Sequence, residues 1–249
     1  MMNKSWLILA IVSVISGCAS MGGGQESRWS YIGDTGPAHW GTLNDKYALC
    51  SDGKSQSPVN IAGAHGMGLT AIEFSYATAQ NLEIVNNGHT IQVNYPAGSY
   101  VVLTGKRFDL LQFHFHSPSE NKIEGEHADL VAHLVHKAAD GQLGVIAVLF
   151  VVGAEENAIL SPVWAAMPLT KGSSNLAQAF DINALLPEDK GYYNFSGSLT
   201  TPPCSENVNW NVLSTRGEVS QAQINAFTQI FPNSIRPVQP LNGRMIGAF

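Results

Sequence analysis

Hydrophobic residues between positions 82 and 152 occur in short runs that turn-forming residues interrupt. Several of these runs alternate between apolar and polar positions, and they are rich in Val, Ile, Leu and Phe. This pattern is typical of short strands, so it predicts a sheet-dominated core. Asp140-Gly141 stands between two apolar runs and is a hairpin signal, so we expect the two flanking strands to be neighbours.

Helical patterns are few along the chain. One lies near Glu155 to Met167, and a second covers 221–230, where Ser220 and Gln223 have the spacing of a capping box. A chain of 249 residues with 45% hydrophobic composition can bury one large core and requires no second domain. The sequence therefore predicts one mainly β (α+β) domain with peripheral short helices.

The segment from Leu110 to His116 alternates in the way that places histidines on one side of a strand. Residues two apart in a strand share a face. Two sets therefore lie on opposite sides: Gln112, His114 and His116 on one, and Leu111, Phe113 and Phe115 on the other. Because the aromatic side fills a core, the histidine side is expected to line a cavity or face water.

A second histidine-bearing strand follows in the run VAHLVHK, in which His133 and Val135 share one face and His136 takes the other. Three neutral imidazoles that converge from two strands suit zinc, whose catalytic sites leave a fourth position to water. An open site of this kind indicates hydrolytic or hydration chemistry. The alternative for the His-x-His pattern taken alone is an accidental pair of surface histidines.

Charge excludes one class of partner. The formal net charge is -6, and no run of five basic residues occurs, so nothing attracts a phosphate backbone. We expect no nucleic acid partner.

The first 18 residues read as a targeting segment, with Lys4 before an apolar run over 6–15. That run is too short for a stable membrane span, which needs about 20 residues. Ile15-Ser16-Gly17-Cys18 resembles a bacterial lipobox, whose cysteine is lipidated after cleavage; plain secretory cleavage nearby is the alternative. We expect a signal peptide over 1–18, a glycine-rich tether over 19–27 and a folded domain over 28–249. The chain would be exported to the periplasmic face of a bacterial membrane and would touch it only through this anchor.

The remaining cysteines are Cys50 and Cys204. With Cys18 assigned to the anchor, an oxidising compartment favours a disulfide between these two. Two buried free thiols are the alternative.

Seven runs together resemble the α-carbonic anhydrases over nearly the whole mature chain, and they occur in the family's order. They are GPAHW at 36–40, QSPVNI at 56–61, NNGH at 86–89, QFHFH at 112–116, HLVH at 133–136, SLTTPPC at 198–204 and RPVQPLNGR at 236–244. The resemblance implies a large, twisted, mostly antiparallel central sheet with zinc at the base of a conical cavity. It also implies reversible hydration of carbon dioxide to bicarbonate and a proton, by attack of a zinc-bound hydroxide, chemistry for which this family is the standard example.

The resemblance assigns a role to each residue that matches a family motif. The expected zinc ligands are His114, His116 and His133, and Gln112 is the expected partner of His114. Thr200 matches the threonine that orients the hydroxide, Glu120 the carboxylate that accepts from it, and His89 the proton shuttle. The expected substrate pocket contains Val135, Val145, Leu199, Thr201 and Trp210, and the expected water network contains Tyr31, Asn87 and Gln92.

One position departs from the family. Two residues before His133, the family usually has a glutamate that accepts a hydrogen bond from that ligand's second nitrogen, whereas this chain has Val131. Loss of such a partner typically costs about 10- to 100-fold in metal affinity or activity. We expect weaker zinc retention than the family norm.

Two other function classes stay open on this fold. One is a binding module without catalysis, since a fold alone does not settle activity. The other is hydrolysis of activated esters, which is expected as a side activity of an open zinc site. The partner is a small molecule in each enzymatic interpretation, and the sequence leaves open whether the chain forms a homodimer.

Overall fold

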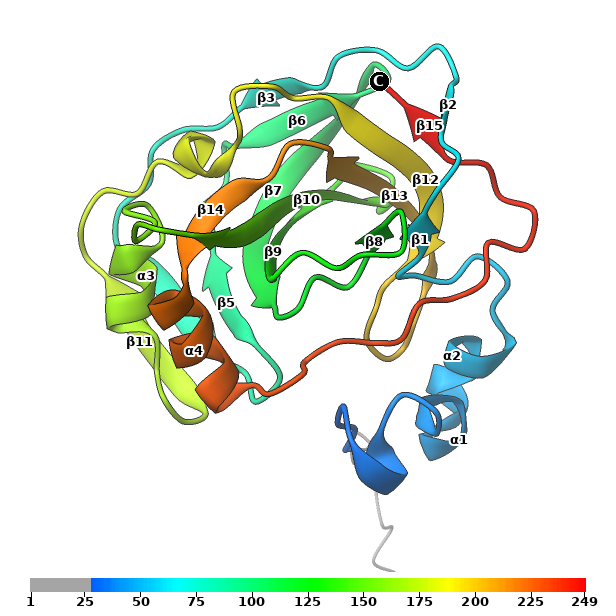
Figure 1. The fold of residues 1–249 in the computed structure, drawn as a ribbon, viewed down its shortest axis with the longest axis horizontal. Coiled ribbons are helices and arrows are strands. Elements are labelled where there is room, and N and C mark those ends of the chain that lie inside the picture. Colours follow the sequence, from blue (N-terminus) through cyan, green and yellow to red (C-terminus); the bar gives the residue numbers. More distant parts are fainter. Residues whose placement is uncertain (1–27) are drawn as a thin grey trace, which may run out of the picture.

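The computed structural model describes residues 28–249. The predicted signal peptide, the lipidation of Cys18 and the tether over 19–27 lie outside the described residues. Within the described part, thirteen strands join one large sheet and two more form a small ribbon (Figure 1). The prediction of a mainly β fold with short helices is confirmed.

The strands of the described chain are mostly short, and the two longest, β7 and β10, contain or adjoin the histidines. They are β1 (Asn60–Ile61), β2 (His65–Gly66), β3 (Glu73–Ser75), β4 (Leu82–Asn86), β5 (Ile91–Asn94), β6 (Tyr100–Leu103), β7 (Lys106–His116), β8 (Lys122–Ile123), β9 (Leu130–Lys137), β10 (Leu143–Gly153), β11 (Gly172–Leu176), β12 (Tyr192–Ser198), β13 (Glu206–Leu213), β14 (Gly217–Ser220) and β15 (Gly247–Ala248).

The large sheet is mixed but mostly antiparallel. Its order is β11-β4-β5-β7-β9-β10-β13-β12-β15-β2, with β6 beside β7, β3 beside β6 and β14 beside β10. The parallel pairs are β10 with β13, β10 with β14 and β15 with β2. As predicted, β9 and β10 form a hairpin, and Gly141 in its turn has a φ of +90°, a conformation that glycine adopts without strain. The middle of the sheet therefore consists of β7, β9, β10 and β13.

Helices lie at the periphery of the sheet (Figure 1). They are α1 (Trp40–Leu43), α2 (Leu49–Asp52), α3 (Ser161–Ala166) and α4 (Gln221–Ile230), with 3-10 turns η1 (Gly33–Thr35), η2 (Asp45–Tyr47) and η3 (Ile182–Leu185). Among residues 28–249, no helix is both long and apolar enough to cross a membrane.

The two predicted helices differ in how well their limits agree with the structure. Helix α4 has the predicted bounds, and both hydrogen bonds of its capping box are present. Helix α3 begins only at Ser161, because the side chain of Asn157 binds backbone N–H groups of the preceding turn. Pro162 then occupies the first turn, where its missing N–H is tolerated.

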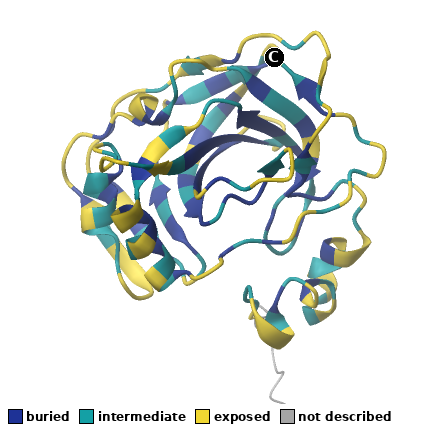
Figure 2. Ribbon diagram, viewed as in Figure 1, coloured by how far each residue is buried: buried dark blue, intermediate teal, exposed yellow. Residues whose placement is uncertain are grey.

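Each face of the sheet carries its own hydrophobic cluster, and the central strands are almost wholly buried (Figure 2). The face that α3 and α4 cover contains Phe113, Phe115 and Leu134. The other face contains Val135, Val145 and Trp210. The second face also presents the histidines, so it carries the candidate site.

The prediction that Leu111 shares the buried face of Phe113 is wrong. The pairing of β7 with β9 shifts between Leu110 and Gln112, which is the mark of a β-bulge. Leu111 is 44% exposed, whereas Leu110 is buried in the core cluster. From Gln112 onward, the residues of β7 pair regularly with β9 and alternate between the two faces. The prediction of which face the histidines occupy is therefore confirmed.

Candidate active site

Three histidines meet on the second face of the sheet. His114 and His116 project from β7, and His133 projects from the neighbouring β9, where it lies directly opposite His114. One ring nitrogen from each of the three lies within 4.8 Å of the others. His116 and His133 are each only 1% exposed, so the group sits deep in the molecule.

In two of these rings, the nitrogen that points away from the space between the histidines has a hydrogen-bond acceptor beside it. Gln112 Oε1 lies 2.9 Å from His114 Nδ1, as predicted for this pair. The carbonyl oxygen of Ser234 lies 2.7 Å from His116 Nδ1. Because each Nδ1 donates its hydrogen outward, each Nε2 presents a lone pair to the shared space.

Electrostatics disfavour the charged form of two of these rings. Burial and the neighbouring His116 ring lower the pKa of His114 well below its ordinary value, and burial and both other rings do the same for His133. Neutral imidazole is the form that ligates metal. His116 Nε2 is buried and has no hydrogen-bond partner among the described residues. Three converging imidazole lone pairs, one of them otherwise orphaned, fit a tetrahedral zinc ion with one open position.

His136 lies on the opposite face of β9, as predicted, and is outside this group. Its Nε2 lies 2.8 Å from the hydroxyl oxygen of Tyr76. Burial lowers its pKa to about 4. His136 is therefore a neutral core residue at physiological pH.

Glu120 is the only acidic side chain against the histidine group in the described chain. Its Oε2 lies 3.6 Å from His116 Nε2 and 3.9 Å from His133 Nδ1, and the residue is fully buried. Its Oε1 accepts from the backbone N–H of Arg236 at 3.0 Å. Oε2 has no hydrogen-bond partner, so the bond expected from the hydroxyl of Thr200, itself 6% exposed, stays a prediction.

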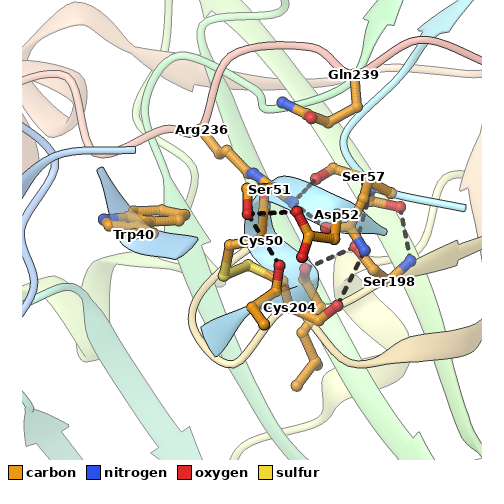
Figure 3. The surroundings of a disulfide bond; sticks show 12 residues. Trp40, Cys50, Ser51, Asp52, Ser57, Ser198, Cys204, Arg236 and Gln239 are labelled. Carbon is orange, nitrogen blue, oxygen red and sulfur yellow. Dashed lines mark hydrogen bonds between the residues drawn. A yellow bond between two sulfur atoms is a disulfide. The ribbon is translucent and has the colours of Figure 1, made fainter. Parts of the chain in front are cut away.

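Arg236 is a structural residue that the sequence interpretation missed, although it stands in one of the quoted runs. It is 2% exposed, and its guanidinium donates to Gln56 Oε1 and to the carbonyl oxygens of Ser57 and Cys50 (Figure 3). Burial lowers its pKa to about 10, so it stays charged at neutral pH. The side chain thus ties α2 to the segment that contains Gln56 and Ser57, while the backbone N–H of the same residue binds Glu120.

The predicted disulfide is confirmed. Cys50 in α2 is bonded to Cys204, which follows the Thr200-Thr201 segment (Figure 3). Both cysteines pack with Trp40 in a small buried cluster. The bond therefore joins the N-terminal part of the described chain to a loop beside the histidines.

His89 lies in the turn between β4 and β5 and is partly buried. Its ring stacks on Trp29 with centroids 3.7 Å apart and planes within 8°, a contact that the sequence did not suggest. A Cβ at Gly88 would lie 2.9 Å from Lys171 Cε, so this lysine crosses the turn. Burial and then the charge of Lys171 lower the pKa of His89.

The other predicted pocket residues occupy positions of two kinds. The apolar set flanks the histidine face: Val135, Val145 and Trp210 lie opposite one another on β9, β10 and β13, and Leu199 packs partly buried against their cluster. Thr201 is partly buried beside Thr200.

The residues of the predicted water network have different hydrogen-bond partners. Gln92 donates to Asn94 Oδ1, and Asn87 Oδ1 accepts from the N–H groups of His89 and Thr90. The Tyr31 hydroxyl has no partner among the described residues.

The hydroxyl of Tyr31 is buried, and it lies close enough to Glu120 to be affected by the charge of that carboxylate. Burial, and then the carboxylate of Glu120, raise the pKa of Tyr31 well above its ordinary value. Its hydroxyl therefore keeps its proton and can act as a hydrogen-bond donor.

Comparison with known proteins identifies the family of this site. A family model described as eukaryotic-type carbonic anhydrase matches residues 35–249. The chain belongs to this family. Carbonic anhydrases of the α class are zinc enzymes, and the three-histidine group of this carbonic anhydrase could hold a metal ion.

Its bacterial relatives match most of the chain. The carbonic anhydrase of Neisseria gonorrhoeae is 46% identical over 225 residues, 90% of this chain and 88% of the relative. That of Pectobacterium atrosepticum is 43% identical over 239 residues, 95% of this chain and 97% of the relative. The solved α-carbonic anhydrase of Thermovibrio ammonificans, in complex with the inhibitor sulfanilamide, has a TM-score of 0.86 at 43% identity and covers 90% of this chain and 100% of that one. The activity that these findings support for this lyase is hydration of carbon dioxide.

Proposed function

We propose that the chain is a zinc-dependent carbonic anhydrase in which His114, His116 and His133 hold the metal and His89 carries protons to solvent. The observation that carries this proposal is the convergence of three imidazoles whose ligand atoms lie within 4.8 Å of one another. His114 and His116 would ligate through Nε2, because each Nδ1 is engaged by an acceptor. His133 would ligate through Nδ1, which faces Glu120 Oε2 together with His116 Nε2.

Bound there, zinc would act as a Lewis acid that lets a water molecule ionise near neutral pH, the property for which carbonic anhydrases are the standard example. The chain's own residues would orient the reactants. Glu120 Oε2 is free to accept a hydrogen bond, and the proposal assigns the Thr200 hydroxyl as its donor, which would leave the threonine oxygen to accept from water and fix the direction of attack. Arg236 holds the other carboxylate oxygen by its backbone N–H, so the acceptor does not rotate away.

Carbon dioxide is apolar and carries no charge, so it favours an apolar wall beside the histidines. Val135, Val145, Leu199 and Trp210 supply that wall. Water is easily displaced from such an apolar surface, so carbon dioxide would bind there, next to the water molecule that Thr200 orients.

Turnover releases a proton that must reach solvent. His89 suits this role because it is partly exposed at the turn and because an imidazole, whose ordinary pKa is about 6.5, can take up and release a proton near neutral pH. In this proposal Tyr31, Asn87 and Gln92 would order the water path between the histidine group and His89, and the protonated Tyr31 hydroxyl can donate a hydrogen bond to it.

We further propose the cellular setting that the sequence suggests. The chain is exported through the signal peptide over 1–18, is lipidated on Cys18, and carries the catalytic domain over 28–249 on the periplasmic face of a bacterial membrane. The Cys50–Cys204 bond supports export, because such bonds persist in oxidising compartments.

Zinc content and carbon dioxide hydration test the proposal on variants of two histidines in the same strand. His133→Ala is expected to lose stoichiometric zinc and nearly all hydration activity. His136→Gln, on the opposite face of β9, is the matched control and is expected to keep both. Equal effects of the two variants, or activity in His133→Ala, would contradict the assignment. One zinc per chain without hydration would indicate a binding protein instead.

A further inference from the structure

The three proposed ligands differ in how their outer nitrogens are held. Acceptor oxygens lie 2.9 Å from His114 Nδ1 and 2.7 Å from His116 Nδ1. His133 Nε2 is buried and has no hydrogen-bond partner among the described residues. One ligand of the three therefore lacks the support that the other two have.

The position that would supply this support is Val131. It lies two residues before His133 on the same face of β9 and is 1% exposed. Its cross-strand neighbours include Leu149 on β10, and it belongs to the apolar cluster of that face. Trp210, whose ring lies 5.0 Å from that of His133, donates its Nε1–H to Ser198 and offers no oxygen.

The orientation of the ring makes this deficit matter for metal binding. His133 Nδ1 faces Glu120 Oε2 at 3.9 Å, on the side where His116 Nε2 also lies. A neutral imidazole that gives its Nδ1 lone pair to a metal carries its hydrogen on Nε2. That N–H is then a buried donor without an acceptor, which disfavours this binding geometry.

We infer that Val131 limits the metal affinity of this site, and that an acceptor oxygen placed at residue 131 would tighten zinc binding by supporting His133. The inference rests on the proposed zinc ligands and concerns a positioning effect, since residue 131 itself does not touch the metal. Partners of metal-bound histidines change affinity by about 10- to 100-fold.

The test measures zinc release to a chromogenic chelator from stoichiometrically loaded protein, so activity is not the readout. Val131→Glu and Val131→Gln are expected to release zinc about 10- to 100-fold more slowly than the unaltered chain. Val131→Leu is the matched apolar control and is expected to release it at the unaltered rate. Equal rates in all four proteins, or an equal slowing by leucine, would overturn the inference.

A second measurement on the unaltered protein covers the case in which polar residues at position 131 prevent folding. The ring N–H protons of zinc-loaded protein labelled with nitrogen-15 report their hydrogen bonds. Those of His114 and His116 are expected far downfield, and that of His133 at a position typical of an unbonded N–H. A His133 signal as far downfield as the other two would overturn the inference.

The outcomes separate this inference from the proposed function. If the unaltered chain binds no zinc, the ligand assignment itself fails. If it binds one zinc that Val131→Glu and Val131→Gln hold no more tightly, only the inference about residue 131 fails.

Discussion

Replacing both Cys50 and Cys204 by serine is expected to destabilise the protein mainly through its unfolded state. The two residues are 154 positions apart in sequence. Cross-linking a loop of that length removes unfolded-chain entropy equivalent to about 5 kcal/mol at 25 °C in the chain-entropy relation. At about 2–4 °C per kcal/mol for a domain of this size, the melting temperature would fall by about 10–20 °C.

The folded state is expected to change little in this variant, because other bonds hold the same elements. Arg236 donates to the carbonyl oxygen of Cys50 at 2.7 Å, and Gln56 Nε2 donates to that of Cys204 at 3.1 Å. Carbon dioxide hydration at 25 °C is therefore expected to stay near the unaltered level. The dependence of unfolding on urea is expected to steepen, because an unlinked chain exposes more surface.

Urea unfolding and thermal melting of the double variant and the unaltered chain test this reasoning, with circular dichroism as the signal. A loss of stability below about 1 kcal/mol would refute the entropic account. Loss of hydration activity at an unchanged melting temperature would also refute the entropic account. The disulfide would then act by holding the loop around Thr200 in its folded conformation, not by restricting the unfolded chain.

Two further predictions concern histidines outside the metal group. Lys171→Ala removes a positive charge beside His89, so the pKa of His89 is expected to rise and the acid fall of kcat for hydration to begin at higher pH; an unchanged pH profile would contradict the contact. The pKa of His136 is about 4 in the folded protein and about 6.5 in the unfolded chain, so the unfolded chain takes up a proton at a higher pH than the folded protein does. The free energy of unfolding is therefore expected to fall as the pH drops from about 6.5 to about 4, by about 3 kcal/mol in all. His136→Gln is expected to remove most of that loss, which unfolding at pH 7 and pH 4 measures, and an equal loss in both proteins would show that other groups cause it.

Strand periodicity was sufficient to place the histidines. A period of two over Gln112 to His116 fixed which rings share a face, and the opposite face of His136 followed from the same rule in the next strand. The bulge at Leu111 could not be read in this way, because an extra residue in one strand depends on its pairing with the partner. It affected only the residues before Gln112, so the histidine faces were unaffected.

Apart from the Cys50–Cys204 disulfide, the contacts between distant segments could not be predicted from the sequence. The stacking of Trp29 on His89 joins residues 60 positions apart, and Lys171 reaches the same turn from a third segment. The role of Arg236 likewise depends on carbonyl groups that only the folded chain brings together. The absence of an acceptor at Val131 was visible in the sequence, but the orphaned nitrogen of His133 required the structure.

Metal reconstitution tests whether hydration of carbon dioxide depends on zinc at the three-histidine group. Zinc is removed from the purified chain with a chelator, and hydration of carbon dioxide is followed by stopped flow as zinc is returned. We expect no activity without metal and full activity at one zinc per chain. Hydration by the metal-free chain, or no recovery at one equivalent of bound zinc, would contradict it.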